Sequence, residues 1–310
     1  MAKESIIIDT DPGIDDAVAI AICLFAKELD VKAICATNGN VALKYTLQNV
    51  LKLQKLLGTK VPVIKGASQP LINKPLSAAS VHGLTGMEGY DFPEPDDSLV
   101  VEGIAAENFH RIVSESPTPV TLVAIGSLTD YALYLRQYPE DIEKIKRLVL
   151  MGGAMGRGNF GVLSEFNFAE DPEAAKIVFE SGLDIYVAPL EVGFQARIKP
   201  EVSEKIKTFG KVGDMFYHLF KKYRGGSFNT GLKIYDALAA AILLKPDLFE
   251  FQRTHVEIET TAENTRGASL MDFRGYLNKP NNATIGVKVD ADRFVDWFVD
   301  AIKTTSEGQK

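Results

Sequence analysis

The stretch Ile6–Ile20, IIIDTDPGIDDAVAI, joins an apolar strand to an apolar helix through a turn that carries four carboxylates. Asp9 and Asp11 end the predicted strand two positions apart, so in an extended chain their side chains point to the same side. Asp15 and Asp16 begin the predicted helix, where free backbone N–H groups and the helix dipole favour negative charge. Helix capping accounts for one or two of these acids, but not for all of them.

Carboxylates packed this closely raise one another's pKa or bind a cation, and a hard divalent ion suits oxygen ligands. No Cys or His lies in the turn to favour zinc, so the residues leave Ca²⁺ and Mg²⁺ as candidates. An EF-hand loop is excluded, because the sixth and twelfth positions counted from Asp9 hold Ile14 and Ile20 instead of Gly and Glu. The turn therefore predicts a metal site.

Around this turn, short β-rich runs alternate with segments of helical period, which is typical of an α/β fold. We expect one domain, residues 1–310, with a mostly parallel, Rossmann-like central sheet flanked by helices. Strands are predicted at residues 5–9, 31–37, 61–64, 120–125, 147–151 and 184–188. Helices are predicted at residues 15–27, 41–57, 128–136, 171–181, 234–244 and 291–303. The active site is expected at the C-terminal ends of the strands, where such sheets bind ligands.

Two further segments have a distinct composition. Residues 65–97 are rich in Gly, Pro and Ser, which predicts loops over a site. Residues 191–229 are richer in Lys and aromatic side chains, which predicts a helical excursion from the sheet.

The overall composition favours a small-molecule enzyme over a nucleic-acid or membrane protein. The formal net charge is −7 and no Lys/Arg run stands out, so neither partner is expected. The longest apolar run, residues 17–26, has ten residues and is too short to span a bilayer. The first residues lack signal-peptide features, and Cys23 and Cys35 lie in apolar surroundings typical of reduced thiols, so we expect a cytoplasmic protein.

Several later blocks follow the acidic turn in a fixed order. They are TNGNVALKYTLQNVLKLQKLLG, PVIKGASQPL, VHGLTG, AIGSLTDYAL, MGGA, GNFGVLSEFNFAEDPEAAKIVFESG and YDALAAAI. Together with DTDPGIDDAVA, they resemble the nucleoside hydrolases, the inosine-uridine-preferring nucleoside N-ribohydrolase family. The resemblance implies the nucleoside hydrolase fold, a homodimer or homotetramer, and Ca²⁺-dependent hydrolysis of the N-glycosidic bond of ribonucleosides to ribose and free base.

The resemblance also implies roles for individual residues. Asp11 matches the general base that acts on the attacking water. The implied metal ligands are Asp11, Asp16, Asp236 and, through its backbone carbonyl, Thr129. The implied substrate-binding residues are Asp15, Asn40, Asn159, Glu165 and Asn167, with Asp9 as a supporting acid. This chemistry is consistent with the residue types, because carboxylates and amides around a sugar stabilise an oxocarbenium-like transition state. Direct attack by water predicts inversion at the sugar.

The group that protonates the departing base is open. In the best-known branch of the family, the position before the distant Asp is a His, whereas here it is Tyr235. Tyr235 can donate a proton, although a free Tyr titrates near 10, or it can stack on the base or pack. His82 is a second candidate donor. The preference for purine, pyrimidine or modified bases is therefore open as well.

Two other functions fit parts of the pattern. A strand followed by two Asp residues one position apart also begins the haloacid-dehalogenase phosphatases, which are Mg²⁺-dependent phosphohydrolases. That family continues with Gly-Thr where this chain has Pro12-Gly13. The other alternative is a non-catalytic protein that binds a ribosyl ligand, because Tyr235 is a weaker proton donor to the departing base than the usual His.

Overall fold

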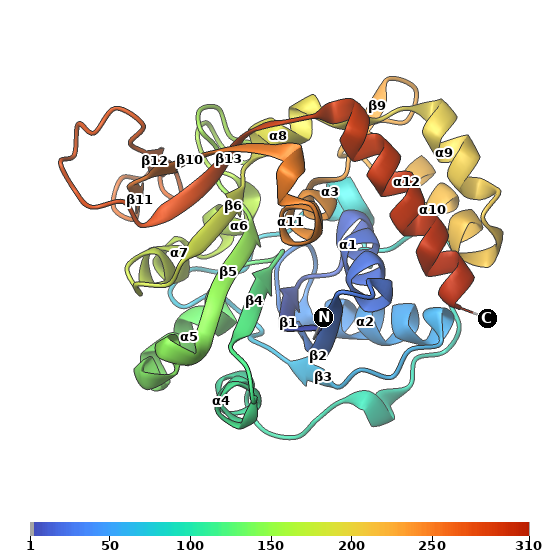
Figure 1. Ribbon diagram of the computed structural model, residues 1–310, viewed down its shortest axis with the longest axis horizontal. Helices are drawn as coiled ribbons and strands as arrows, with labels where there is room; N and C mark the ends of the chain where they lie inside the picture. Colours follow the sequence, from blue (N-terminus) through green and yellow to red (C-terminus); the bar gives the residue numbers. More distant parts are fainter. Residues whose placement is uncertain (1–2, 310) are drawn as a thin grey trace.

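The computed structural model describes residues 3–309 and is built around an eight-stranded sheet (Figure 1). The strand order is β10-β13-β6-β5-β4-β1-β2-β3, and every neighbouring pair is parallel except β10 and β13. The strands are β1 (Glu4–Thr10), β2 (Leu29–Ala36), β3 (Val63–Lys65), β4 (Val120–Ala124), β5 (Ile145–Met151), β6 (Ile185–Ala188), β10 (Phe249–Thr254) and β13 (Ala283–Val289). The predicted α/β class, the six predicted strands and the mostly parallel sheet are confirmed.

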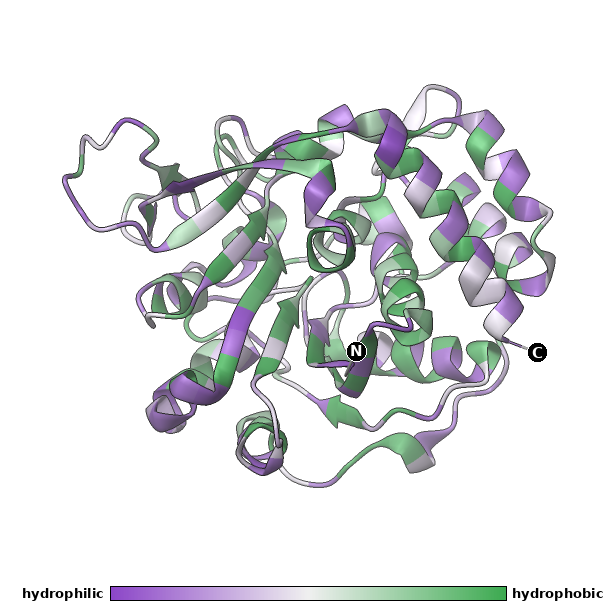
Figure 2. Cartoon of the chain, viewed as in Figure 1, coloured by the Kyte–Doolittle hydropathy of each residue, from purple (hydrophilic) through white to green (hydrophobic). Residues whose placement is uncertain are grey.

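Helices cover both faces of the sheet. One face packs against α1 (Ile14–Phe25), α2 (Leu43–Leu57) and α11 (Tyr235–Leu244), while α10 (Gly210–Lys222) and α12 (Ala291–Gly308) pack on α1 as an outer layer. The other packs against α4 (Ala105–Glu115), α5 (Thr129–Gln137) and α7 (Pro172–Phe179). Figure 2 shows that the hydrophobic residues concentrate on the central strands and on α1 and α11, while α12 alternates between hydrophobic and hydrophilic residues. Within residues 3–309, no helix is long and apolar enough to cross a membrane.

The remaining elements lie around the edge that carries the site. The predicted loop segment contains only a short helix, α3 (Ala79–His82), and one turn of 3₁₀ helix. The predicted helical excursion is confirmed as α8 (Leu190–Gln195), α9 (Pro200–Lys207) and α10. The other small elements are α6 (Phe166–Glu170), the antiparallel pair β11 (Val256–Ile258) and β12 (Ser269–Met271), and the three-stranded sheet of β7 (Arg197–Ile198), β9 (Gly231–Lys233) and β8 (Gly226–Ser227).

The strand order places a topological switch point between β1 and β4. From β1 the chain proceeds outward through β2 to β3, and then returns to β4 on the opposite side of β1. Loops that leave β1 and β4 therefore diverge and open a crevice at the carboxyl ends of these strands. The backbone N–H of Ile125, directly after β4, donates to the carbonyl of Asp9 at 2.9 Å, so the acidic turn lines this crevice.

Candidate active site

Asp11 and Asp16 are held rigidly beneath the crevice. The carboxylate of Asp16 accepts from the Thr10 hydroxyl at 2.7 Å and from the backbone N–H of Gly13 at 2.9 Å. Oδ2 of Asp11 accepts from the backbone N–H of Asn40 at 2.6 Å, whereas its Oδ1 is buried without a hydrogen-bond partner among the described residues. The amide of Asn40 also donates to the Asp11 carbonyl at 3.2 Å and to Asp16 at 3.3 Å. Asn40 therefore ties the two acids together.

Asp236 reaches the acidic turn because α11 packs against α1. Carboxylate oxygens of Asp15, Asp16 and Asp236 all lie within 4.8 Å of one another, and each side chain is buried. Burial raises the pKa of Asp236 well above its ordinary value, and the neighbouring carboxylates of Asp15, Asp16 and Asp11 raise it further. Burial likewise raises the pKa of Asp15 to about 6. Such a concentration of buried acids needs a positive partner.

Both helix N-termini that carry these acids point at the same place. Asp15 and Asp16 lie in the first turn of α1, and Asp236 lies in the first turn of α11. The partial positive charge at each N-terminus stabilises a carboxylate, typically by 0.3–1 kcal/mol at an exposed site. Two helix ends offset only part of the repulsion, because a single pair of unit charges 4.8 Å apart costs on the order of 3 kcal/mol at an effective dielectric constant of 20.

A cavity of about 340 Å³ opens above this group. Its polar lining includes Asp15, Asn40, His82, Asn159, Glu165, Asn167, Tyr223, Arg224, Lys233, Tyr235 and Asp236. The volume is within the range of small-molecule sites. The structure thus brings together eight of the predicted site residues in the cavity wall, with Asp11 and Asp16 directly behind it.

Asn159, Glu165 and Asn167 form one wall of the cavity, at the start of α6. Glu165 caps this helix, accepting from the backbone N–H groups of Asn167 at 3.0 Å and Gly153 at 3.1 Å. Oδ1 of Asn159 accepts from the backbone N–H of Phe166 at 2.9 Å, and the amide of Asn167 donates to the carbonyl of Ile125 at 3.3 Å. Burial raises the pKa of Glu165 to about 7. These side chains are positioned to bind hydroxyl groups.

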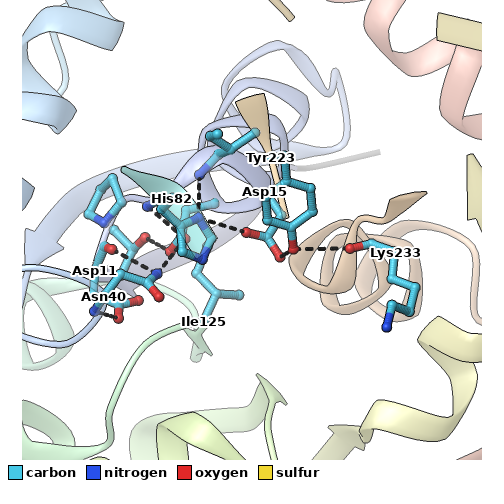
Figure 3. Close-up of polar contacts among 12 residues, drawn as sticks. Asp11, Asp15, Asn40, His82, Ile125, Tyr223 and Lys233 are labelled. Atoms are coloured by element: carbon cyan, nitrogen blue, oxygen red, sulfur yellow. Dashed lines mark hydrogen bonds and ion pairs between the residues drawn. The ribbon is translucent and has the colours of Figure 1, made fainter. Parts of the chain in front are cut away.

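His82 and Tyr223 surround Asp15 on another side. Nδ1 of His82 accepts from the backbone N–H of Ile14 at 3.1 Å, which leaves Nε2 to carry the ring proton. The Tyr223 hydroxyl lies 2.8 Å from Oδ2 of Asp15 and 3.1 Å from the carbonyl of Lys233 (Figure 3). Burial lowers the pKa of His82 to about 4, so the ring is neutral at pH 7.

The predicted supporting acid Asp9 lies outside the cavity. It is fully buried and approaches Cys35 and Asp130 on the α5 side of β1. Neither carboxylate oxygen of Asp9 has a hydrogen-bond partner among the described residues. Burial raises the pKa of Asp9 well above its ordinary value, and the charge of Asp130 raises it further. Asp9 is therefore buried behind the site and does not line the cavity.

Comparison with known proteins identifies the family of the chain. The inosine-uridine preferring nucleoside hydrolase family matches residues 6–296. The chain belongs to this family. It is 44% identical over 299 residues to the non-specific ribonucleoside hydrolase RihC of Salmonella paratyphi C, covering 96% of this chain and 97% of that protein. Its fold superposes on a purine-preferring ribonucleoside hydrolase from Gardnerella vaginalis with a TM-score of 0.91 at 26% identity, covering 98% and 99% of the two chains. A plant nucleoside hydrolase gives 0.89 at 27% identity, covering 97% and 99%.

As a nucleoside hydrolase, the protein is a glycosidase, and its acidic clusters could hold a metal ion. The structure does not bring the predicted ligand Thr129 to the cavity. Thr129 begins α5, and its hydroxyl donates to Asp171 at 2.7 Å. Four residues earlier, Ile125 follows β4 directly and does line the cavity. A backbone oxygen has no side-chain signature, which is why residue types alone did not single out Ile125.

Sequence reasoning also missed the acids that hold the loop segment over the nucleoside hydrolase site. Glu170 accepts from the amide of Asn38 at 2.5 Å and from the backbone N–H of Leu76 at 2.8 Å. Asp171 accepts from the backbone N–H of Leu71 at 2.8 Å. Both acids stand in the block GNFGVLSEFNFAED, directly after the substrate wall. The charge of these two acids in a helical segment was a signal. Their backbone partners could not be identified from it, because they are distant in the sequence, as Leu71 is 100 residues from Asp171.

Proposed function

We propose that this nucleoside hydrolase cleaves the N-glycosidic bond of ribonucleosides, releasing ribose and the free base, and that it requires Ca²⁺. The observation that carries the proposal is the group of mutually repelling buried carboxylates directly beside a cavity lined with amides. A sugar diol needs this combination, because its hydroxyl groups donate to carboxylates and accept from amides.

The donor set suits a hard divalent cation. Asp16 and Asp236 supply carboxylate oxygens that lie, together with one of Asp15, within 4.8 Å of one another. The orphaned Oδ1 of Asp11 is a further buried acceptor that needs a partner. We assign the backbone ligand to the carbonyl of Ile125, because it faces the cavity region and Thr129 does not. When bound, Ca²⁺ supplies a positive charge that acidifies a neighbouring water and orients the sugar diol. The all-oxygen set favours Ca²⁺ or Mg²⁺ over zinc, and family membership supports Ca²⁺.

Asp11 is placed to act as general base. Its Oδ2 is fixed by Asn40, and its Oδ1 is free to accept a proton from the attacking water. Asp15 accepts the ribose 2′-hydroxyl, and Asn159, Glu165 and Asn167 bind the remaining hydroxyls. As the glycosidic bond breaks, these groups stabilise the positive charge that develops on the sugar.

The relatives bear on the choice of base. RihC of Salmonella paratyphi C is described as non-specific, whereas the structural neighbour from Gardnerella vaginalis is described as purine-preferring. The much higher identity to RihC favours acceptance of both purine and pyrimidine ribonucleosides. A homodimer or homotetramer and a cytoplasmic location stay predictions.

The alternative phosphohydrolase requires Asp9 as the nucleophile. Asp9 lies beside Cys35 and Asp130 on the α5 side of β1, whereas Asp11 contacts Asn40 of the cavity wall, so a phosphate ester in the cavity would meet Asp11 and not Asp9. The ribosyl-binding alternative predicts tight binding of ribose or a nucleoside without release of base.

The test is a panel of purine and pyrimidine ribonucleosides, with free base and ribose measured before and after chelation. We expect base release that EGTA abolishes and Ca²⁺ restores; restoration by Mg²⁺ but not by Ca²⁺ would contradict the ion assignment. Asp11→Asn should lower kcat by about 10²–10⁴-fold. Asp214→Asn, at a half-exposed acid of α10, is the matched control. Phosphate release from esters, or binding without cleavage across the panel, would overturn the proposal.

A further inference from the structure

Two cationic side chains, Arg224 and Lys233, line the cavity. The guanidinium of Arg224 already donates to the carbonyls of Lys221 at 3.3 Å and Lys222 at 2.9 Å, at the C-terminal end of α10. By contrast, Nζ of Lys233 has no carboxylate within 4.0 Å in the described part of the chain. A guanidinium does not give up a proton in proteins, so Lys233 is the cation of the cavity wall that could give a proton to a ligand.

The fold fixes where the side chain of Lys233 starts. Its backbone N–H donates to Gly225 at 3.0 Å, and its carbonyl accepts from the Tyr223 hydroxyl at 3.1 Å. The ammonium lies 5.0 Å from the ring centroid of Phe194 and 5.7 Å from that of Tyr235. Aromatic faces attract a cation but leave its N–H groups without acceptors. The N–H groups of the Lys233 ammonium are therefore available to donate to a ligand.

Lys233 also lies at the end of the site away from the catalytic acids. Figure 3 shows it on the far side of Asp15 and Tyr223 from Asp11 and Asn40. A sugar held by Asp15 and its neighbours would leave the base to occupy the part of the cavity bounded by Lys233, Tyr223 and Tyr235. Burial lowers the pKa of Lys233, and the neighbouring Arg197 lowers it further, which makes the ammonium a better proton donor than a free lysine.

On these observations, and resting on the proposed function, we propose that Lys233 is a catalytic residue that donates a proton to the departing base. As the bond between C1′ and the base nitrogen breaks, the electron pair stays on the base. The oxygen of water bonds to C1′, and its proton passes to Asp11. The ammonium of Lys233 gives a proton to the base, which leaves neutral. Asp11 then returns its proton to solvent, and Lys233 recovers one.

The test compares two ribosides that differ in how much help the leaving group needs. A ribonucleoside leaves as a basic anion unless it is protonated, whereas p-nitrophenolate leaves from p-nitrophenyl ribofuranoside without a proton. We expect Lys233→Met to lower kcat on the nucleoside by about 100-fold, the size typical of general acid catalysis, with kcat on the nitrophenyl riboside nearly unchanged. Lys233→Arg should recover part of the loss.

Lys207→Met is the matched control, because the ammonium of Lys207 also lies over a tyrosine ring, 4.5 Å from Tyr217, but away from the cavity. Equal loss of activity on both substrates would mean that Lys233 only supports packing, and no loss on the nucleoside would overturn the proposal directly. If Lys233→Met does not fold, Lys233→Gln is measured on the same pair of substrates. Failure of the wild type to cleave either riboside would refute the proposed function instead.

Discussion

Gly39 makes room for the proposed general base, so Gly39→Ala tests the geometry of the site without removing any functional group. A Cβ at position 39 would lie 2.0 Å from Oδ2 of Asp11, whereas ordinary contact begins at 3.4 Å, so the oxygen must retreat by about 1.4 Å. Gly126 packs closely on the other side of the same carboxylate, since a Cβ there would lie 2.8 Å from Oδ1. Asp11 thus lies between two backbone segments that approach it closely because both carry glycine.

The consequences of this displacement can be estimated. The 2.6 Å hydrogen bond from the backbone N–H of Asn40 would be lost or bent, and a buried donor without a partner costs about 1–3 kcal/mol of stability. A 1 Å error in the position of a catalytic group can lower the rate by about 10²-fold. We therefore expect Gly39→Ala to lower Tm by several degrees and kcat by about two orders of magnitude.

The assay is release of free base from a ribonucleoside at saturating Ca²⁺, together with thermal unfolding. Gly156→Ala is the control, because nothing lies within 4 Å of a Cβ at that position and its φ is not positive. Wild-type kcat and Tm in Gly39→Ala would refute the reasoning, since Asp11 would then tolerate a shift larger than the structure allows.

Three further predictions concern proton and product chemistry. Burial raises the pKa of Glu165 in the folded protein to about 7 from an ordinary value of 4.5, so stability falls as pH rises through this window. Glu165→Gln should lack about 2.5 kcal/mol of the fall between pH 5 and pH 8, measured by urea unfolding, and parallel curves for both proteins would contradict this. Tyr235→Phe should keep kcat on nucleosides within about tenfold if Lys233 is the donor, and a 100-fold loss would return the role to Tyr235. Proton NMR of fresh product should show α-ribose first, and β-ribose first would exclude inversion.

The acids of the site could be predicted from the sequence, because each is a charged residue inside or directly beside an apolar segment. Asp11, Asp15 and Asp16 follow an unmistakably buried strand, and Asp236 interrupts an apolar helix, so each needed a partner. The structure brings these acids together as predicted, because parallel strands end at one edge of a sheet. Most of the predicted strands could be found because they lie inside the sheet, where residues buried on both faces form continuous apolar runs.

Features that depend on long-range packing could not be predicted in this way. The antiparallel pair β10 and β13 was missed, because its strands mix charged and apolar residues and pair residues that are 29 (Thr254 with Ala283) to 40 (Phe249 with Val289) positions apart. Lys233 was missed because an isolated lysine is ordinarily a solvated surface residue. Its place on β9 in the cavity wall, beside the Phe194 and Tyr235 rings, is what distinguishes it, and that place depends on long-range packing.

The composition of α11 connects the fold to the acid group. This helix reads YDALAAAILL, and Ala237, Ala239, Ala240 and Ala241 are all at most 1% exposed. Small side chains let two helices approach closely, so α11 can pack against α1 and deliver Asp236 to within 4.8 Å of Asp15 and Asp16. A larger residue would separate the two helix ends and relieve the charge repulsion, but it would also disperse the donors that a cation needs. The alanines therefore fix the spacing of the acids, although none of them contacts a ligand.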